Sequence, residues 1–149
     1  QRAKQLGLVC VAHAGEEGPA DYIQEALDLL EVQRIDHGVR CLESAEVVER
    51  LRSEQIVLTV CPLSNVSLKV VEELRDHPLP KLLEKGLKVT ISSDDPAYFG
   101  GGMLANHSAC AEDFGWDEAV FRQMTRNAIE EAFVTEARRD ELLSRLSAL

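Results

Sequence analysis

Apolar and polar positions along the chain follow two patterns, which predict strands that alternate with helices. The apolar run at residues 8–12 lacks the alternation of a half-exposed strand. Such a run is typical of a strand buried on both faces in a parallel sheet that helices cover. Further strands are expected at residues 56–60 and 87–91. A fourth, shorter strand is expected at residues 34–36.

Helical patterns fill the intervals between these strands. The first helix carries a single apolar stripe, formed by Tyr22, Ile23, Ala26, Leu27 and Leu30. Ser44 is a favourable N-cap for a second helix, and Gly86 is a favourable end for a third helix at residues 81–85. Beyond the fourth strand only helices are expected, and two of them begin after Asp117 and Thr135.

Strands that alternate with helices predict a parallel sheet joined by right-handed crossovers. The chain has 149 residues, too few for a complete (β/α)8 barrel, which needs roughly 200 to 250. Four strands fit either a small open sheet or half of a barrel. No linker or change of composition divides the chain, so we expect residues 1–149 to form one unit.

The amino-acid composition argues against a nucleic-acid partner and against a membrane span. With 16 basic and 26 acidic residues the net charge is −10, which argues against nucleic acid, since phosphate binding needs clustered cations. No apolar run approaches the roughly 18 residues of a membrane span. The four cysteines form no C-x-x-C pair and we recognise no signal peptide, so a cytoplasmic protein is expected. Gln1 opens a polar stretch typical of a helix end, so we expect a piece of a longer chain.

Polar residues follow the end of each of the four strands. The four groups are His13-Ala14-Gly15-Glu16, Asp36-His37-Gly38, Cys61-Pro62-Leu63-Ser64-Asn65 and Ser93-Asp94-Asp95-Pro96. The carboxyl ends of parallel strands converge at the ligand site of α/β folds, so we expect these groups to face one site. Two histidines and several carboxylates suit Zn²⁺ or Fe²⁺, and such a metal converts water to hydroxide near neutral pH. A carboxylic acid such as Glu16 can then protonate a leaving group or a ring nitrogen.

Taken together, the four groups resemble the adenosine/adenine deaminase family, metal-dependent (β/α)8 barrels of the amidohydrolase superfamily. Their order and spacing are similar over essentially the whole chain. The segments 34–38 and 94–101 are more similar to the adenine deaminase branch, because adenosine deaminases usually have glycine where Asp36 stands. The resemblance implies an α/β fold that is the C-terminal half of the barrel, strands five to eight, with covering helices and a helical C-terminal tail.

The resemblance also implies a role for each candidate residue. His13 and Asp94 would be zinc ligands. Glu16 would donate a proton to N1 of the purine, and His37 would orient or deprotonate the zinc-bound water. Asp95 would form a hydrogen bond with N7. Attack of hydroxide at C6 would then convert adenine to hypoxanthine and ammonia.

One part of the family pattern is missing from this sequence. The family completes its metal site with a His-x-His pair on the first barrel strand, and this chain has no such pair. Tight catalytic sites use three or more protein ligands, so we expect the chain alone to bind zinc weakly and to be nearly inactive.

The sequence leaves alternative functions open. Adenosine is the nearest alternative substrate, and a different amidohydrolase activity is a less favoured alternative. The alternative from another class is a non-catalytic half-barrel. Its open sheet edges and apolar inner face would associate with a second copy or with a missing N-terminal half.

The remaining candidates have plainer explanations beside the functional ones. Gly15 is expected beside the substrate by the same resemblance. Ser64 and Asn65 either cap their loop or contact the substrate. His77 is expected to be solvated, and His107 is expected to pack within a helix. Three side chains at helical spacing are expected in the core: Trp116, Phe121 and Met124.

Overall fold

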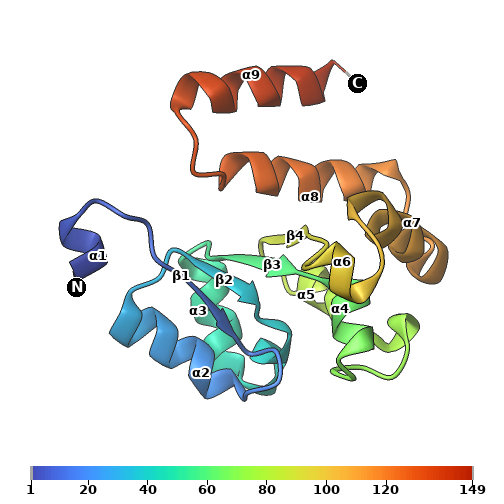
Figure 1. Ribbon diagram of the computed structural model, residues 1–149, viewed down its shortest axis with the longest axis horizontal. Helices are drawn as coiled ribbons and strands as arrows, with labels where there is room; N and C mark the ends of the chain where they lie inside the picture. The colour runs from blue at the N-terminus through green and yellow to red at the C-terminus, as the bar shows by residue number, and fades with distance from the viewer. Residues whose placement is uncertain (1, 149) are drawn as a thin grey trace.

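Four parallel strands form one sheet in the order in which they occur in the sequence (Figure 1). The computed structural model describes residues 2–148. The strands are β1 (Val11–Ala14), β2 (Arg34–His37), β3 (Val57–Val60) and β4 (Val89–Ile91). Each pairs with the next strand along the chain, so β1 and β4 are the two edges of this sheet. A parallel sheet in sequential order is half of the pattern of a (β/α)8 barrel.

Helices and helical turns connect the strands. Between β1 and β4 they are α2 (Ala20–Glu25), its π-helical continuation η1 (Ala26–Leu30), η2 (Val39–Glu43), α3 (Ala45–Ser53), α4 (Pro62–Ser67), η3 (Leu74–Asp76) and α5 (Leu79–Glu84). The others are α1 (Arg2–Gln5), α6 (Pro96–Phe99), α7 (Met103–Phe114), α8 (Glu118–Glu130) and α9 (Glu136–Ser147). Within residues 2–148, none of the helices combines the length and the apolar character that crossing a bilayer requires.

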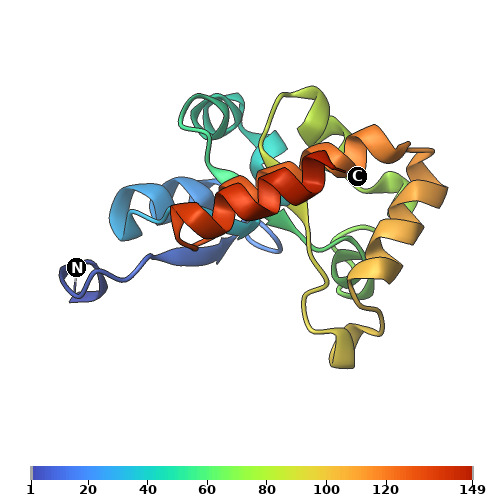
Figure 2. The same cartoon turned by 90° about the horizontal axis from the view of Figure 1, so that it is seen from above.

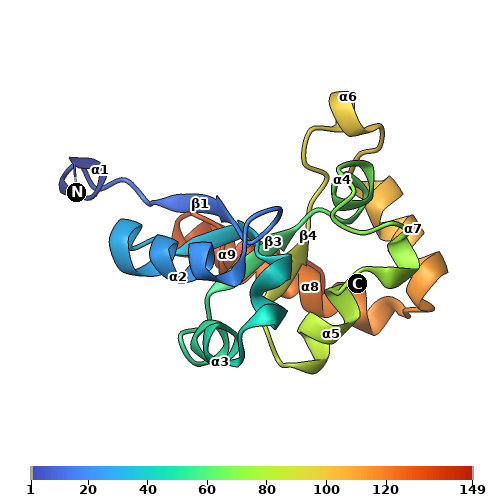
Figure 3. The same ribbon diagram turned by 90° about the horizontal axis from the view of Figure 1, so that it is seen from below.

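The helices lie on both sides of the sheet. In Figures 1 and 3, α2 and α3 are on one side, and the antiparallel pair α8 and α9 is on the other. Asn127 of α8 donates a hydrogen bond to the Val89 carbonyl of β4 at 2.8 Å, which attaches this pair to the sheet. Figure 2 shows α1 at the N-terminal end, apart from the body of the molecule.

The hydrophobic core lies between the sheet and the helices that follow the strands. Its largest fully buried apolar side chains are Ile23, Ile35, Leu51, Leu58, Leu79, Leu82 and Met124. Trp116 and Phe121 pack against this core, as the sequence predicts. In the predicted stripe of the first helix, however, only Ile23, Ala26 and Leu27 are buried. Tyr22 and Leu30 are more than half exposed.

The opposite face of the sheet differs from the prediction. The expected inner face is apolar, but Arg34, Thr59 and Thr90 lie together on it and line one open cavity. Arg34 pairs with Asp36 on the same face, with Nε and Oδ1 3.0 Å apart. The inner face is therefore largely polar, because the residues that alternate with the buried core positions carry hydroxyl and charged groups.

Three helix starts are confirmed by their capping hydrogen bonds. The Ser44 hydroxyl accepts from the Val47 N–H at 3.3 Å, the Asp117 carboxylate caps α8, and the Thr135 hydroxyl caps α9. Each cap satisfies a backbone donor that the helix itself leaves without a partner. Gly86 follows α5 with φ +72°, which a residue without a side chain adopts at little cost.

The bounds of the first strand differ most from the prediction. The first strand occupies 11–14 instead of 8–12, and Leu8 and Val9 are exposed. Within residues 2–148, β1 pairs only with β2, and its register begins at Val11 opposite Arg34, so the earlier apolar residues have no strand beside them. The opening stretch is helical over Arg2–Gln5, while Gln1 lies outside the described residues.

His77 is not solvated as predicted but is 3% exposed. Its Nδ1 accepts a hydrogen bond from the Leu79 N–H at 3.0 Å, and its Nε2 lies 3.1 Å from Oδ1 of Asn65. The ring therefore folds inward at the start of α5 and joins it to α4. Burial lowers the pKa of His77 to about 4, because the charged imidazolium would lose its hydration. His107, by contrast, is half-buried with its ring centroid 5.4 Å from that of Phe121, which fits the expected packing role.

The buried His77 predicts that acid destabilises the fold. Its pKa is lower in the folded protein than the 6.5 of an unperturbed histidine, so between pH 6.5 and 4 the unfolded state binds the extra proton. Stability then falls as the pH falls through this window, by about 3 kcal/mol for this one group. Urea unfolding at pH 7 and at pH 4.5 should show a smaller loss in His77→Gln than in the wild type. The half-buried His107 is the control, and a His107→Gln variant that flattens the profile as much would contradict the assignment to His77.

Candidate metal and proton-transfer site

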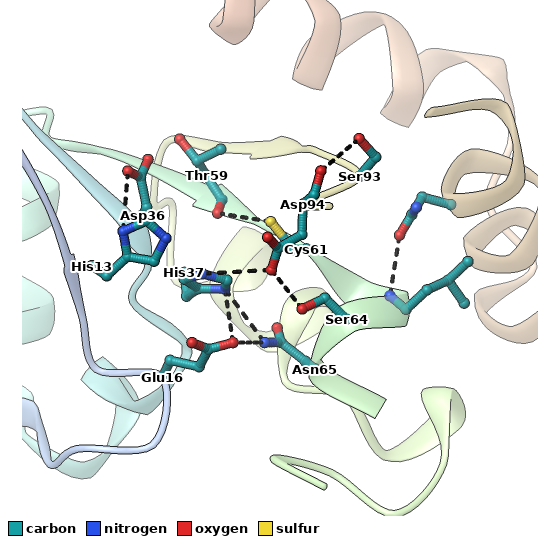
Figure 4. A network of polar contacts seen from close by, with 12 residues as sticks. His13, Glu16, Asp36, His37, Thr59, Cys61, Ser64, Asn65, Ser93 and Asp94 are labelled. Carbon is teal, nitrogen blue, oxygen red and sulfur yellow. Dashed lines mark hydrogen bonds and ion pairs between the residues drawn. The ribbon is translucent and has the colours of Figure 1, made fainter. Parts of the chain in front are cut away.

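The polar groups that follow the four strands converge at one edge of the sheet, as the sequence predicts (Figure 4). An open cavity of about 320 Å³ lies there. Its lining includes His13, Asp36, His37, Thr59, Cys61 and Asp94. The register of β1 and β2 places His13 directly beside Asp36. Residues from all four strands and their following turns therefore share this cavity.

His37 lies at the centre of the site and is 1% exposed. Its Nδ1 is 3.1 Å from Oε1 of Glu16, and its Nε2 is 4.0 Å from Oδ2 of Asp94. Burial lowers the pKa of His37, and the nearby His13 lowers it further, while the carboxylates of Asp94 and Asp36 oppose this shift. The ring is therefore neutral near pH 7, and one of its nitrogens can accept a proton.

The environment of Glu16 favours the protonated carboxylic acid more than water does. Burial raises the pKa of Glu16, and the negative charge of Asp94 raises it further. Its Oε1 accepts a hydrogen bond from Nδ2 of Asn65 at 2.8 Å. The preceding Gly15 has φ +68°, and a Cβ at this position would overlap the side chain of Ile23. The turn that places Glu16 beside His37 therefore requires glycine.

Asp94 faces the same cavity from the turn after β4. Its Oδ2 accepts a hydrogen bond from the Ser64 hydroxyl at 2.6 Å. Asp94 and His37 both have positive φ, +57° and +65°, a strained conformation for residues with a side chain. From the sequence, Ser64 and Asn65 could either cap their loop or contact the substrate. Both are fully buried, and their side chains hold Asp94 and Glu16 respectively.

The donor atoms at this site fit a metal ion. Within residues 2–148, His37, Cys61 and Asp94 each offer one ligand atom, and these atoms lie within 4.8 Å of one another. His13, the other predicted ligand, is outside this group but lines the same cavity, with its ring centroid 5.0 Å from that of His37. Imidazole nitrogen with carboxylate oxygen is a donor set that zinc accepts.

Cys61 is a poor candidate for a ligand despite its position. Burial, together with the negative charges of Asp94, Glu16 and Asp36, raises the pKa of its thiol to about 12. Its Sγ donates a weak hydrogen bond to the Thr59 carbonyl at 3.7 Å. Since a thiolate is the form that binds metals, these surroundings favour His13 over Cys61 beside Asp94.

Asp95 has a structural function in addition to the predicted contact with N7. Its Oδ1 accepts hydrogen bonds from the N–H groups of Ala97 and Tyr98, and so caps α6. The residue is exposed and does not line the cavity around His37 and Asp94. One carboxylate oxygen is therefore committed to the helix, and the other remains for a ligand.

Two residues of this region were not singled out for the site. Asn106 of α7 accepts a hydrogen bond from the Leu63 N–H at 3.1 Å and so anchors the start of α4. His77 contacts Asn65 from the loop before α5. Neither follows a strand, so the pattern that identified the other residues does not include them. Burial of a polar side chain is the only signal, and it requires the three-dimensional structure.

Comparison with known proteins agrees with this geometry. A sequence model of the adenosine deaminase family matches residues 1–149. The adenine deaminase of Rhodospirillum rubrum is 54% identical over 148 residues, which is 99% of this chain and 44% of that protein. The adenine deaminase of Hahella chejuensis is 53% identical over 146 residues, with 98% and 44% covered. The chain thus spans less than half the length of the curated relatives that it matches.

Solved structures show the same relationship. The crystal structure of adenine deaminase from Arthrobacter aurescens superimposes with a TM-score of 0.97 at 50% identity, covering 99% of this chain and 45% of that one. An amidohydrolase from Burkholderia ambifaria with bound Zn has a TM-score of 0.83 at 27% identity, covering 98% and 44%. The predicted fold, the C-terminal half of a (β/α)8 barrel, is confirmed, and these relatives imply a metal site. The chain belongs to the adenosine deaminase family.

Proposed function

We propose that this chain is the proton-transfer half of an adenine deaminase, which hydrolyses adenine to hypoxanthine and ammonia with one zinc ion. The observation that carries the proposal is the contact of Glu16 with His37, which lines the cavity at the strand ends together with His13 and Asp94. Adenine is favoured over adenosine because the curated relatives at 53–54% identity are named adenine deaminases. Asp36, where adenosine deaminases usually have glycine, supports the same choice.

In this proposal two residues of the chain move protons. Glu16, whose pKa is raised by burial, donates its proton to N1 of the purine and so makes C6 more electrophilic. His37, whose pKa is lowered by burial, accepts a proton from the attacking water. Gly15 brings the backbone close to the substrate, and the free oxygen of Asp95 binds N7. Burial thus favours the protonated form of Glu16 and the neutral form of His37, which are the forms that a proton donor and a proton acceptor need.

His13 and Asp94 are the residues that would hold the zinc ion. Asp94 is fixed by the Ser64 hydroxyl, and His13 lies 3.8 Å from Asp36, which is itself paired with Arg34. Bound zinc lowers the pKa of water to near 7. Two protein ligands are fewer than the three of a usual catalytic zinc site, so the proposal requires ligands from outside this chain.

The proposed partner of this chain is the N-terminal half of the barrel. The edge strand β1 and the segment before it carry exposed apolar side chains, among them Leu6, Leu8, Val9 and Val11. A further strand paired with β1 would cover them and remove an open sheet edge. Association with a second copy is the alternative, which size-exclusion chromatography would reveal as a species larger than 16.5 kDa.

The four free cysteines fit the reducing cytoplasm, where we place the protein.

Joining the chain to an N-terminal half tests the proposed activity. Residues 1–149 are fused behind the N-terminal half of the Rhodospirillum rubrum enzyme, and ammonia release from adenine and adenosine is measured. We expect the fusion to act on adenine, and the chain alone to be slower by about 10³-fold or more, because the chain alone lacks the remaining ligands. The intact relative is the positive control. A folded, zinc-loaded fusion that acts only on adenosine, or on neither purine, would contradict the proposal.

Removing the proton of Glu16 should abolish most of the activity. Glu16→Gln in the fusion keeps the shape of the side chain but cannot donate an acidic proton, so kcat should fall by about 10² to 10⁴-fold. Glu17→Gln is the matched control, since Glu17 is exposed and adjacent in sequence. Steady-state kinetics on adenine measure both variants. Equal losses in the two would remove Glu16 from the reaction.

Zinc affinity should distinguish His13 from Cys61. His13→Ala and Asp94→Asn in the fusion should weaken zinc binding by roughly tenfold or more, because each removes a proposed ligand. Cys61→Ser should leave the affinity close to that of the parent fusion, since the buried thiol retains its proton. Titration with a competing chelator measures the three affinities. Loss of zinc in Cys61→Ser alone would reassign the site to the group of His37, Cys61 and Asp94.

A further inference from the structure

We infer that His77 is a positioning residue for the proposed deamination, which sets the orientation of the Asn65 amide and thereby the oxygen of Glu16 that carries the proton. The inference rests on the proposed function. His77 does not line the cavity, and it lies twelve residues from Asn65 in the chain. His77 acts through three side chains that contact one another in turn, namely Asn65, Glu16 and His37. Each of them is buried or mostly buried.

The first step fixes the proton on the His77 ring. Nδ1 accepts the Leu79 N–H at 3.0 Å, and a backbone N–H can only donate. Nδ1 is therefore the unprotonated nitrogen, and the neutral ring carries its proton on Nε2. The burial that lowers the pKa of His77 to about 4 keeps the ring neutral at physiological pH.

The second step fixes the amide of Asn65. The oxygen and nitrogen ends of an amide have almost the same shape, so hydrogen bonds must select between two orientations. The Nε2–H of His77 lies 3.1 Å from the Asn65 end assigned as Oδ1, which must therefore be an acceptor. Nδ2 is then the end that faces Glu16 and His37, at 2.8 Å from Oε1 and 3.4 Å from Nδ1. The reverse orientation would place two donors together at His77 and an acceptor against Oε1.

The third step concerns Glu16. Its Oε1 accepts from Asn65 and lies 3.1 Å from Nδ1 of His37. A proton on Oε1 would face the donor of Asn65, so the acidic proton belongs on Oε2. Nδ1 of His37 lies closer to Oε1, at 3.1 Å, than to Nδ2 of Asn65, at 3.4 Å, so it donates its proton to Oε1 and does not accept from Asn65. This leaves Nε2 of His37 as the acceptor on the side of Asp94. His77 thus sets which atoms of Glu16 and His37 can give and take protons.

Two conservative substitutions separate this role from a structural one. His77→Gln places an amide donor near the position of Nε2 and retains the bond to Asn65. His77→Asn places an acceptor near the position of Nδ1 and retains the bond to the Leu79 N–H, but lacks the donor to Asn65. A helix-capping role predicts that Asn is the better substitute, whereas positioning of Asn65 predicts that Gln is.

The two variants are compared in the fusion protein with adenine as substrate. We expect His77→Asn to lower kcat by about 10- to 100-fold with little change in KM, as for outer-shell partners of active-site groups, and His77→Gln to retain most of kcat. Zinc content and thermal melting are measured on both, so that loss of folding or metal is recognised. Unchanged kcat in His77→Asn, or equal losses in both variants, would overturn the inference.

A second measurement does not depend on turnover. The ring nitrogens of the four histidines of this chain are observed by ¹H–¹⁵N correlation NMR in the 149-residue protein and in the fusion, with the His77 signals assigned from His77→Gln. We expect His77 to be neutral with its proton on Nε2, and a proton on Nδ1 would overturn the inference. A fusion that is inactive on both purines but shows the Nε2–H form would instead refute the proposed function and leave the hydrogen-bond chain in place.

Discussion

Buried polar groups must be paired, and this constraint governs the site more than any other. His37, Asn65 and His77 are each less than 4% exposed. A buried donor or acceptor without a partner costs about 1–3 kcal/mol, so each of these side chains restricts the orientation of the next. The order of contacts from His77 through Asn65 to Glu16 is therefore a consequence of burial. The chemical differences between the two nitrogens of His37 and the two oxygens of Glu16 follow from it.

The backbone contributes a second constraint at the same place. His37 and Asp94 both adopt positive φ where a strand ends, although neither is a glycine. Such conformations cost on the order of 1–3 kcal/mol and persist where the surrounding structure enforces them. In this site, contacts with neighbouring side chains hold the two strained residues: the Ser64 hydroxyl donates a hydrogen bond to Asp94, and Glu16 contacts His37. Both residues line the cavity at the strand ends.

The strand order, three helix caps and the edge of the sheet that carries the polar groups could be predicted from the sequence. These features depend on residues that are close together along the chain. Ser44 could be predicted as an N-cap because its hydrogen-bond partner, the Val47 N–H, is only three residues away. His77 could not be predicted in the same way, because its environment is set by Asn65 of a different helix. The first strand was misplaced for a related reason. Pairing with β2 determines its start at Val11, and hydrophobicity alone extends it to Leu8.

The position of the four strands in a barrel explains why the proposed proton-transfer residues all lie in this chain, whereas the proposed metal ligands do not. A (β/α)8 barrel closes only when all strand ends surround one axis, so a ligand at that axis is held by both halves. This chain supplies the proposed proton donor and acceptor as one hydrogen-bonded unit, since Oε1 of Glu16 contacts both Nδ2 of Asn65 and Nδ1 of His37. The proposed metal ligands are not complete in this sense, because the side chain of His13 is exposed on edge strand β1. In the proposed function, proton positioning therefore depends on this half alone, whereas tight metal binding and turnover depend also on ligands from the other half.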